Sequence, residues 1–346
     1  MDEPSATLTK KELNALFDII RDLKKRGIAV IYISHRMEEI FEICETATVM
    51  RDGRIIGTVN VGEVSPDRIV EMMVGREVSS AYPRRDTVPG EEILRVENLC
   101  RKDRKQNVSF SLRKGEVLGI AGVAGSGQRE LLESIAGLYP IASGSVTYYD
   151  PADGKTKNLV GMDPMDIRKS GIAMSFVPED RLGMGLVGSM GMTGNMMLRS
   201  WRKGHGVFLN RKDPEDLAQR IWQELEVVTP STSFPVRRMS GGNVQKVLVG
   251  REIATAPSVL MTAYAVRGLD INTSYTIYNL LTKEKMQGSA VIYVGEDLDV
   301  LLELCDRILV LCGGKVSGIV DGRTTTKEEV GLLMTRVGGK EKAAHE

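Results

Sequence analysis

The order of apolar and polar positions repeats along the chain. Residues 27–59 read GIAVIYISHRMEEIFEICETATVMRDGRIIGTV, and residues 288–320 read GSAVIYVGEDLDVLLELCDRILVLCGGKVSGIV. The two align without a gap at an offset of 261 residues (288 minus 27). Each begins with a continuous apolar run, typical of a strand buried on both faces of a parallel sheet, and continues with a helical period and two short strands. We interpret this pattern as an internal duplication.

A second pattern predicts a strand, a loop and a helix in that order. GEVLGIAG is strand-like, a glycine-rich loop follows, and QRELLESIAG has a helical period. A phosphate loop would need Lys and then Ser or Thr after its last glycine, but Gln128 and Arg129 stand there. Without the ammonium group and the hydroxyl, we expect the loop not to support hydrolysis, and whether it binds nucleotide through its backbone N–H groups stays open. The candidate nucleotide-binding residues are Gly122, Gly125, Ser126, Gly127 and Gln128.

A third pattern marks the start of a helix. Ser240, Gly241 and Gly242 precede an amphipathic run, so we expect Ser240 to cap a helix whose first N–H groups stay open beside the glycines. Such an end binds phosphate through these donors and the helix dipole. An ordinary capped helix is the alternative, and these three residues alone do not decide between the two.

Acidic and imidazole groups near the beginning of the chain are candidates for chemistry. Asp2 and Glu3 form a pair that, at a strand end, holds Mg²⁺ and polarises a water in phosphoryl transfer. His35 closes the apolar run VIYISH, and the carboxyl end of a parallel strand faces the ligand crevice. An acidic tail and a surface-loop histidine are the alternatives.

Composition narrows the class of protein. The 346 residues carry 46 Lys and Arg against 46 Asp and Glu, so the net charge of zero disfavours nucleic acid as a main partner. The four cysteines form no C-x-x-C pair, which favours reduced core residues over disulfides or zinc ligands. No apolar run reaches the ~18 residues of a membrane-spanning helix, and no signal peptide is recognisable. We expect a soluble cytoplasmic protein, or one held at a membrane by partners.

The duplication sets the expected domain boundaries. Residues 1–78 form the first unit, 79–92 a polar linker, 93–336 the second unit and 337–346 a disordered tail. Gly122 precedes Ala263 by 141 residues (263 minus 122), whereas nothing comparable precedes Asp2. We therefore expect the first unit to lack roughly 140 residues at its front.

Together the motifs resemble a known family. MSGGNVQK, VPEDR, RGLD, GEDLD and VEMMVGR are similar to motifs of ATP-binding cassette ATPases, in particular the fused two-cassette subunits of bacterial importers for simple sugars and nucleosides. The resemblance implies an α/β fold, a P-loop NTPase-type cassette with a mixed sheet, an antiparallel β subdomain and an α-helical subdomain. It also implies ATP and Mg²⁺ as cofactors, and a peripheral position at the cytoplasmic face of the cell (inner) membrane.

The same resemblance implies partners and residue roles. The partners are integral-membrane permease subunits, a second cassette or missing N-terminal half, and indirectly an extracellular substrate-binding protein. Asp2 is similar to the Mg²⁺-associated carboxylate, Glu3 to the general base and His35 to the switch histidine. Ser240, Gly241 and Gly242, the signature turn, resemble the motif that caps ATP on an opposite cassette. Pro178, Glu179, Asp180 and Arg181, called the permease loop below, are similar to the loop that faces the permease in this family.

The second unit departs from the family pattern. At the offset of 261, Asp2, Glu3 and His35 align with Ala263, Tyr264 and Glu296. Since the loop also lacks its Lys, we expect the second cassette to be non-catalytic. Two other functions stay open: a nucleotide-binding pseudo-ATPase that regulates, and a soluble cassette protein of DNA repair or translation. Zero net charge and the importer-like motifs disfavour the last.

Overall fold

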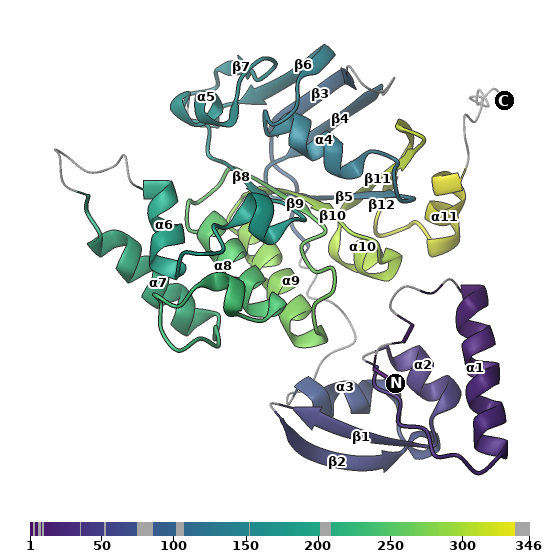
Figure 1. Ribbon diagram of the computed structural model, residues 1–346. Coiled ribbons are helices and arrows are strands. Elements are labelled where there is room, and N and C mark those ends of the chain that lie inside the picture. Colours follow the sequence, from purple (N-terminus) through teal and green to yellow (C-terminus); the bar gives the residue numbers. More distant parts are fainter. Residues whose placement is uncertain are drawn as a thin grey trace, which may run out of the picture. The chain divides into compact units, whose positions relative to one another are not determined.

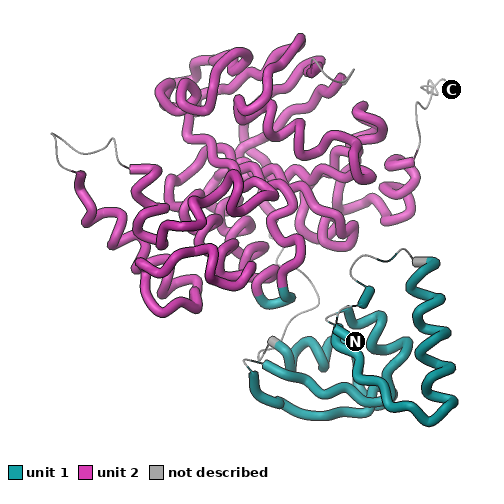
Figure 2. The backbone as a smooth tube through the Cα atoms, viewed as in Figure 1, with its two compact units in different colours: residues 1–81, 270–272 teal, residues 82–269, 273–346 magenta. Residues whose placement is uncertain are grey.

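The computed structural model describes residues 1–346 except 3, 6, 7, 9, 35, 52, 75–85, 102–106, 152, 201–208 and 336–346. Two predicted site residues, Glu3 and His35, therefore lie outside the described residues, as do the expected tail and the first half of the expected linker, residues 79–85. The chain forms two compact units. Unit 1 comprises residues 1–81 with 270–272, and unit 2 comprises residues 82–269 and 273–346 (Figure 2).

Unit 2 is built on a six-stranded mixed sheet of order β12-β11-β5-β10-β9-β8 (Figure 1). Five neighbouring strands are parallel, and β12 runs antiparallel to β11. The strands are β5 (Val117–Gly122), β8 (Met174–Val177), β9 (Val259–Ala263), β10 (Ala290–Val294), β11 (Arg307–Cys312) and β12 (Lys315–Asp321). Every residue of β9 and β10 is buried, as expected for parallel strands covered on both faces.

A four-stranded antiparallel sheet of order β4-β3-β6-β7 forms a second layer of unit 2. Its strands are β3 (Glu92–Arg101), β4 (Val108–Arg113), β6 (Ile141–Tyr149) and β7 (Thr156–Asn158). Since β3 begins at Glu92, the strand takes up the last residue of the expected linker.

Helices cover the sheets of unit 2. The α-helices are α4 (Gln128–Ile135), α5 (Pro164–Lys169), α6 (Met192–Ser200), α7 (Lys212–Glu224), α8 (Gly241–Ile253), α9 (Ile271–Met286), α10 (Leu298–Leu304) and α11 (Lys327–Thr335), with a π-helical turn η2 (Arg181–Gly185) and a 3₁₀ turn η3 (Val236–Arg238). Helices α6, α7 and α8 form an α-helical subdomain (Figure 1). Within the described ranges, no helix is long and apolar enough to span a bilayer.

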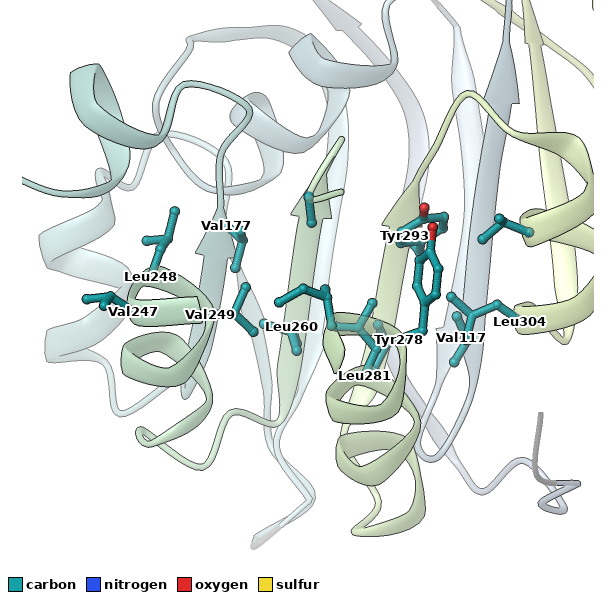
Figure 3. Packing of buried hydrophobic residues seen from close by; sticks show 14 of the residues in the cluster. Val117, Val177, Val247, Leu248, Val249, Leu260, Tyr278, Leu281, Tyr293 and Leu304 are labelled. Atoms are coloured by element: carbon teal, nitrogen blue, oxygen red, sulfur yellow. The ribbon is translucent and has the colours of Figure 1, made fainter. Parts of the chain in front are cut away.

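The two faces of the mixed sheet carry separate hydrophobic cores. Side chains alternate along a strand, so in β5 Val117 joins one core while Leu118 and Ile120 join the other. The first core packs against α8, α9 and α10 (Figure 3). The second core is closed by α4 and the antiparallel sheet. These layers are the ones that the sequence predicts: a mixed sheet, an antiparallel β subdomain and an α-helical subdomain.

Five elements of unit 1 have counterparts in the last third of unit 2. It contains α1 (Lys10–Lys25), α2 (Met37–Ile43), β1 (Thr46–Arg51), β2 (Arg54–Asn60), the 3₁₀ turn η1 (Val61–Glu63) and α3 (Pro66–Val74). The bounds of α1, α2, β1, β2 and α3 recur at the 261-residue offset as those of α9, α10, β11, β12 and α11. Even the register shift between Val49 and Met50 recurs between Val310 and Leu311.

One predicted strand does not form in unit 1. The apolar run from Ala29 makes a single parallel bridge, between Ile33 and Asp2, where its counterpart β10 pairs with a strand on each side. Ile31 is 79% exposed, whereas Ile292 at the same place in the repeat is fully buried. A strand requires hydrogen-bonding neighbours, and the described residues of unit 1 offer residues 29–33 only this one bridge.

Candidate functional site

The glycine loop (residues 122–127) joins β5 to α4 in unit 2. A side chain at Gly122 would place its Cβ 2.5 Å from Gln128 Nε2 and 2.8 Å from the carbonyl oxygen of Leu311. Gly125 and Gly127 have φ values of +81° and +100°, which favour glycine. The loop therefore needs its glycines both for close packing and for backbone conformation.

Gln128, at the position of the missing lysine, turns into the loop. Its side chain is buried, and Nε2 donates a hydrogen bond of 3.2 Å to the carbonyl oxygen of Val123. The backbone N–H of Ser126 donates to the same oxygen at 3.0 Å. The amide of Gln128 thus holds the loop closed from inside, and it brings no positive charge to a phosphate.

Arg129, at the position of the missing hydroxyl, belongs to a chain of ion pairs. It lies 3.8 Å from Glu179, which pairs at 2.6 Å with Arg267, and Arg267 reaches Glu296 at 3.4 Å. These residues follow β8, β9 and β10, so the carboxyl ends of three parallel strands are joined to α4. The hydrogen bond that Arg267 donates to Glu179 is the main cause that raises the pKa of Arg267. Because most of these groups are half exposed, salt screens the pairs.

The end of β9 carries no carboxylate. Ala263 and Tyr264 stand where the repeat in unit 1 has Asp2 and Glu3. Tyr264 has a φ of +51°, and burial raises the pKa of its phenol, so it stays neutral at physiological pH. Across the described part of the chain, no cluster of three or more His, Cys, Asp or Glu side chains is arranged to hold a metal ion. With Glu179 and Glu296 paired to Arg267, the site in unit 2 does not fit Mg²⁺.

The signature turn begins α8 as the sequence predicts. Ser240 is the N-cap, and its Oγ accepts hydrogen bonds from the backbone N–H of Asn243 at 3.4 Å and from Asn243 Nδ2 at 2.8 Å. Asn243 Oδ1 in turn accepts from the backbone N–H of Val228 at 2.9 Å. Ser240 and Gly241 are exposed. The first turn of α8 is therefore fixed to Val228 through Asn243, while Ser240 and Gly241 remain accessible to solvent.

The permease loop lies between β8 and α8. Pro178 is buried, and Asp180 caps η2 by accepting from the backbone N–H groups of Leu182 and Gly183. Arg181 donates through Nε to Gln245 Oε1 at 2.8 Å and through Nη2 to the carbonyl oxygen of Arg267. Sequence reasoning did not identify Gln245, because only the fold brings α8 beside this loop.

A groove of about 640 Å³ opens beside the permease loop. Its wall is largely apolar, and η2 contributes Met184 to it. Other lining residues come from α5, β8, α6 and α8, among them Met165, Phe176, Pro178, Leu198 and Ala254.

In unit 1, Asp2 is exposed and its neighbour Met1 is bonded to the apolar run. The N-terminal amine donates to the carbonyl oxygen of Ile31 at 2.9 Å, and the N–H of Ile33 donates to the carbonyl oxygen of Met1 at 2.9 Å. Asp2 therefore stands at a strand-like bridge, at the place of Ala263 in unit 2.

Sequence reasoning also missed a polar cluster in unit 1 around Glu39. Oε2 of this buried carboxylate accepts hydrogen bonds from Ser5 Oγ at 2.8 Å, Tyr32 OH at 2.8 Å and Ser34 Oγ at 3.0 Å. The cluster ties the turn after Asp2 to α2. Its signal was the MEE sequence at the start of α2, which a surface charge explains equally well.

Comparisons with known proteins give one consistent result. The family model described as ABC transporter matches residues 105–262. The galactose/methyl galactoside import ATP-binding protein of Clostridium perfringens is 38% identical over 95% of this chain, and the chain spans 63% of that protein's length. The ribose import ATP-binding protein of Geobacillus kaustophilus is 39% identical, with 95% and 65% covered. The xylose import ATP-binding protein of Moorella thermoacetica is 40% identical, with 98% and 67% covered.

Solved structures show the same fold. A dimeric ATP-binding cassette in a post-hydrolysis state, bound to ADP and Pi, has a TM-score of 0.57 at 22% identity, over 67% of this chain and 100% of that one. An ATP-binding cassette of an ABC transporter in its ADP conformation has a TM-score of 0.54 at 22% identity, over 70% and 95%.

Proposed function

Because the chain belongs to the ATP-binding cassette family of ABC transporters, we propose that it is an energy-coupling subunit of an importer for simple sugars or nucleosides. The names of the three relatives, import ATP-binding proteins for galactose, ribose and xylose, support this proposal. ATP binding would drive the closure of paired cassettes, and integral-membrane permease subunits would use that motion. The protein would then work at the cytoplasmic face of the membrane, and it would meet an extracellular binding protein only through the permease.

Unit 2 is proposed to bind nucleotide without hydrolysing it. The observation that carries this proposal is the pair Gln128 and Arg129: one is folded onto Val123, and the other is engaged with Glu179. Backbone N–H groups of the glycine loop would hold the phosphates. Gln128 and Arg129 stand where the hydrolytic step would need an ammonium group and a Mg²⁺-binding hydroxyl, and Ala263 and Tyr264 stand where it would need carboxylates at the end of β9. The signature turn would cap ATP held by an opposing cassette.

Hydrolysis is proposed for the cassette to which unit 1 belongs. There Asp2 would associate with Mg²⁺, Glu3 would act as general base and His35 would contact the terminal phosphate. The phosphate loop would come from a second cassette or a further half of the first, through a strand that pairs with residues 29–33. The exposure of Ile31 and Ile33, 79% and 54%, supports such a partner, because β5 and β9 flank their counterparts in unit 2.

An ion pair at the same place in both units gives further support. Lys24 pairs with Glu45 at 2.5 Å, and at the 261-residue offset Lys285 pairs with Asp306 at 2.8 Å. The pair in unit 1 is exposed, whereas the pair in unit 2 is buried, where Asp306 Oδ2 also accepts from the backbone N–H of Val117 at the start of β5. A strand equivalent to β5 would cover the pair of unit 1 in the same way.

The groove beside the permease loop is proposed as the permease contact. Its apolar wall suits a short amphipathic helix of a membrane subunit, laid into it by one face. Met184, on η2, supplies an adaptable side chain where the groove meets the permease loop.

The experiment that tests the role of unit 2 restores its loop. The double variant Gln128→Lys/Arg129→Thr returns an ammonium group and a hydroxyl, so we expect nucleotide to bind about tenfold more tightly or better, as one added charge-assisted contact allows. Hydrolysis should stay absent because Ala263, Tyr264 and Glu296 are unchanged. Isothermal titration calorimetry with ATP and a phosphate-release assay measure the two quantities.

The chain contains a matched control for this experiment. Gln219 and Arg220 form the same dipeptide on an exposed face of α7, so Gln219→Lys/Arg220→Thr should leave affinity unchanged. Wild-type turnover of about 1 per second or more, typical of an enzyme, would refute the non-hydrolytic role of unit 2. The alternative function is a regulatory pseudo-ATPase. It would be favoured if the chain binds nucleotide and Glu3→Gln changes neither transport nor hydrolysis. The uncharged Gln128 at the position of the lysine also supports this alternative.

A further inference from the structure

The permease loop and the helix that starts at the signature turn are bonded along one helix face. Three residues of α8 spaced by three positions, Gln245, Leu248 and Arg251, all contact the turn η2. Residues three apart lie on the same side of a helix. The turn η2 therefore runs along α8, rather than touching it at one point.

Each contact is tight. Gln245 Oε1 accepts from Arg181 Nε at 2.8 Å, and Arg251 Nη2 donates to the carbonyl oxygen of Gly185 at 2.7 Å. Between them, Gly185 lies so close to Leu248 that a Cβ would sit 2.7 Å from Leu248 Cδ2. Gln245 and Arg251 are buried, so breaking either bond leaves a polar group without water.

The turn itself is internally bonded. The backbone N–H groups of Met184 and Gly185 donate to the carbonyl oxygen of Asp180 at 3.2 and 3.1 Å, and that of Leu186 donates to Arg181 at 2.7 Å. The Asp180 carboxylate caps the open end. We therefore expect η2 to move as one piece, so that a displacement of η2 also displaces the side chains of α8 that it contacts.

Arg181 occupies the position that connects this turn to the signature turn. Its guanidinium bonds to Gln245, one helical turn after Gly241, and to the carbonyl oxygen of Arg267, after β9. A Cβ on Gly241 would lie 3.3 Å from Arg181 Nη1, so the guanidinium lies directly against the signature turn. One side chain thus touches two segments far from it in sequence, the start of α8 and the residues after β9.

We propose that Arg181 is a positioning residue that makes the permease loop and the signature turn move together. The inference rests on the proposed function, because only there do these segments meet a permease and a nucleotide. Displacement of η2 would shift the signature turn through Arg181 and Gln245. The far end of α8 has its own bond to η2, from Arg251 to the carbonyl oxygen of Gly185, which does not involve Arg181.

Hydrogen–deuterium exchange on the full chain tests this inference. Amides 184–186 report on η2 and amides 244–247 on the first bonded turn of α8, since earlier helix N–H groups have no intrahelical acceptor. In Arg181→Ala, we expect both sets to exchange roughly tenfold faster, as the loss of a buried hydrogen bond implies, while amides 250–253 stay unchanged. Gln245→Leu should give the reciprocal result, with faster exchange in 184–186.

Two further variants sharpen the test. Lysine is a point donor and does not reach both Gln245 Oε1 and the Arg267 carbonyl, so Arg181→Lys should not restore protection. Arg238→Ala, at an exposed arginine of η3, is the control and should change neither set.

Faster exchange in 184–186 alone, with 244–247 as in the wild type, would overturn the proposal, as would full rescue by lysine. If Arg181→Ala does not fold, Arg181→Lys and Gln245→Leu decide the question. No nucleotide or permease enters the measurement, so a negative result here differs from a failure of the proposed function, which the ATP titration reports.

Discussion

At the scale of single residues, Glu39 shows how a carboxylate is kept ionised inside unit 1. Burial, the largest effect, would raise its pKa, but hydrogen bonds from Ser5, Tyr32 and Ser34 together lower the pKa below its ordinary value. The phenol of Tyr32 responds in the opposite direction: burial first, and then its bond to Glu39, raise the pKa of Tyr32 to about 12. The cluster therefore stabilises the folded state only while Glu39 is charged.

A pH-dependent prediction follows for this residue. A lowered folded-state pKa stabilises unit 1 above the unfolded value of about 4.3, and this contribution is lost as pH falls through the folded value. In Glu39→Gln, we expect amides 36–43 to exchange faster at pH 7 and, after correction for intrinsic rates, to lose less protection as the pH falls from 7 to 3. The neighbouring exposed Glu38→Gln is the control. Equal protection in Glu39→Gln and the wild type at pH 7 would contradict this prediction.

At the scale of elements, the position of η2 on α8 depends on the absence of one side chain. Gly185 has no Cβ, and the two methyl groups of Leu248 would lie 2.7 and 3.2 Å from one. This close approach lets the carbonyl oxygen of Gly185 reach Arg251. The packing of η2 on α8 therefore depends on Gly185 and Leu248 together.

Overpacking at this contact is measurable. Gly185→Ala should destabilise unit 2 by about 1–3 kcal/mol because Leu248 must shift. Leu248→Ala alone should cost about 2–5 kcal/mol, and the double variant should cost less than the sum because each change relieves the other. Urea unfolding followed by the fluorescence of the two tryptophans gives these values. Gly331→Ala, where a Cβ meets nothing within 4 Å, should be neutral or stabilising. Strict additivity would show that the two residues are not in contact.

At the scale of the whole molecule, neighbouring strands decide which repeat becomes a sheet. The tetrapeptide AVIY occurs in both repeats, at residues 29–32 and 290–293. In unit 2 it lies within β10 between β5 and β9, and in unit 1 it is not a strand. The same residues are buried in one unit and largely exposed in the other.

The same substitution should therefore strongly destabilise unit 2 and have little effect on unit 1. Ile292→Lys buries an unpaired charge in the sheet, so unit 2 should lose its cooperative unfolding transition. Ile31→Lys changes an exposed side chain, and its free energy of unfolding should stay within about 0.5 kcal/mol of the wild type. Circular dichroism during urea unfolding compares the two. Collapse of unit 1 in Ile31→Lys would refute the exposed arrangement of residues 29–33.

The sequence by itself determined the properties that depend on near neighbours. The duplication predicted elements whose bounds agree between the two units. The sequence also identified Ser240 as a helix cap. It showed directly that Gln128 and Arg129 replace the lysine and the hydroxyl residue of a phosphate loop. Helix periods, caps and turns arise from contacts within a few residues, so a local pattern is sufficient for them.

Only the tertiary structure decided what depends on residues far apart in the chain. Whether AVIY forms a strand required its neighbours, and the partners of Glu39, Arg129 and Arg181 lie on other elements. Strand pairing and side-chain bonds between elements join groups that have no fixed spacing in sequence, so no local pattern encodes them. For this reason the sequence predicted the cassette and its altered loop, whereas the bond from Arg181 to Gln245 in α8 could be identified only from the tertiary structure.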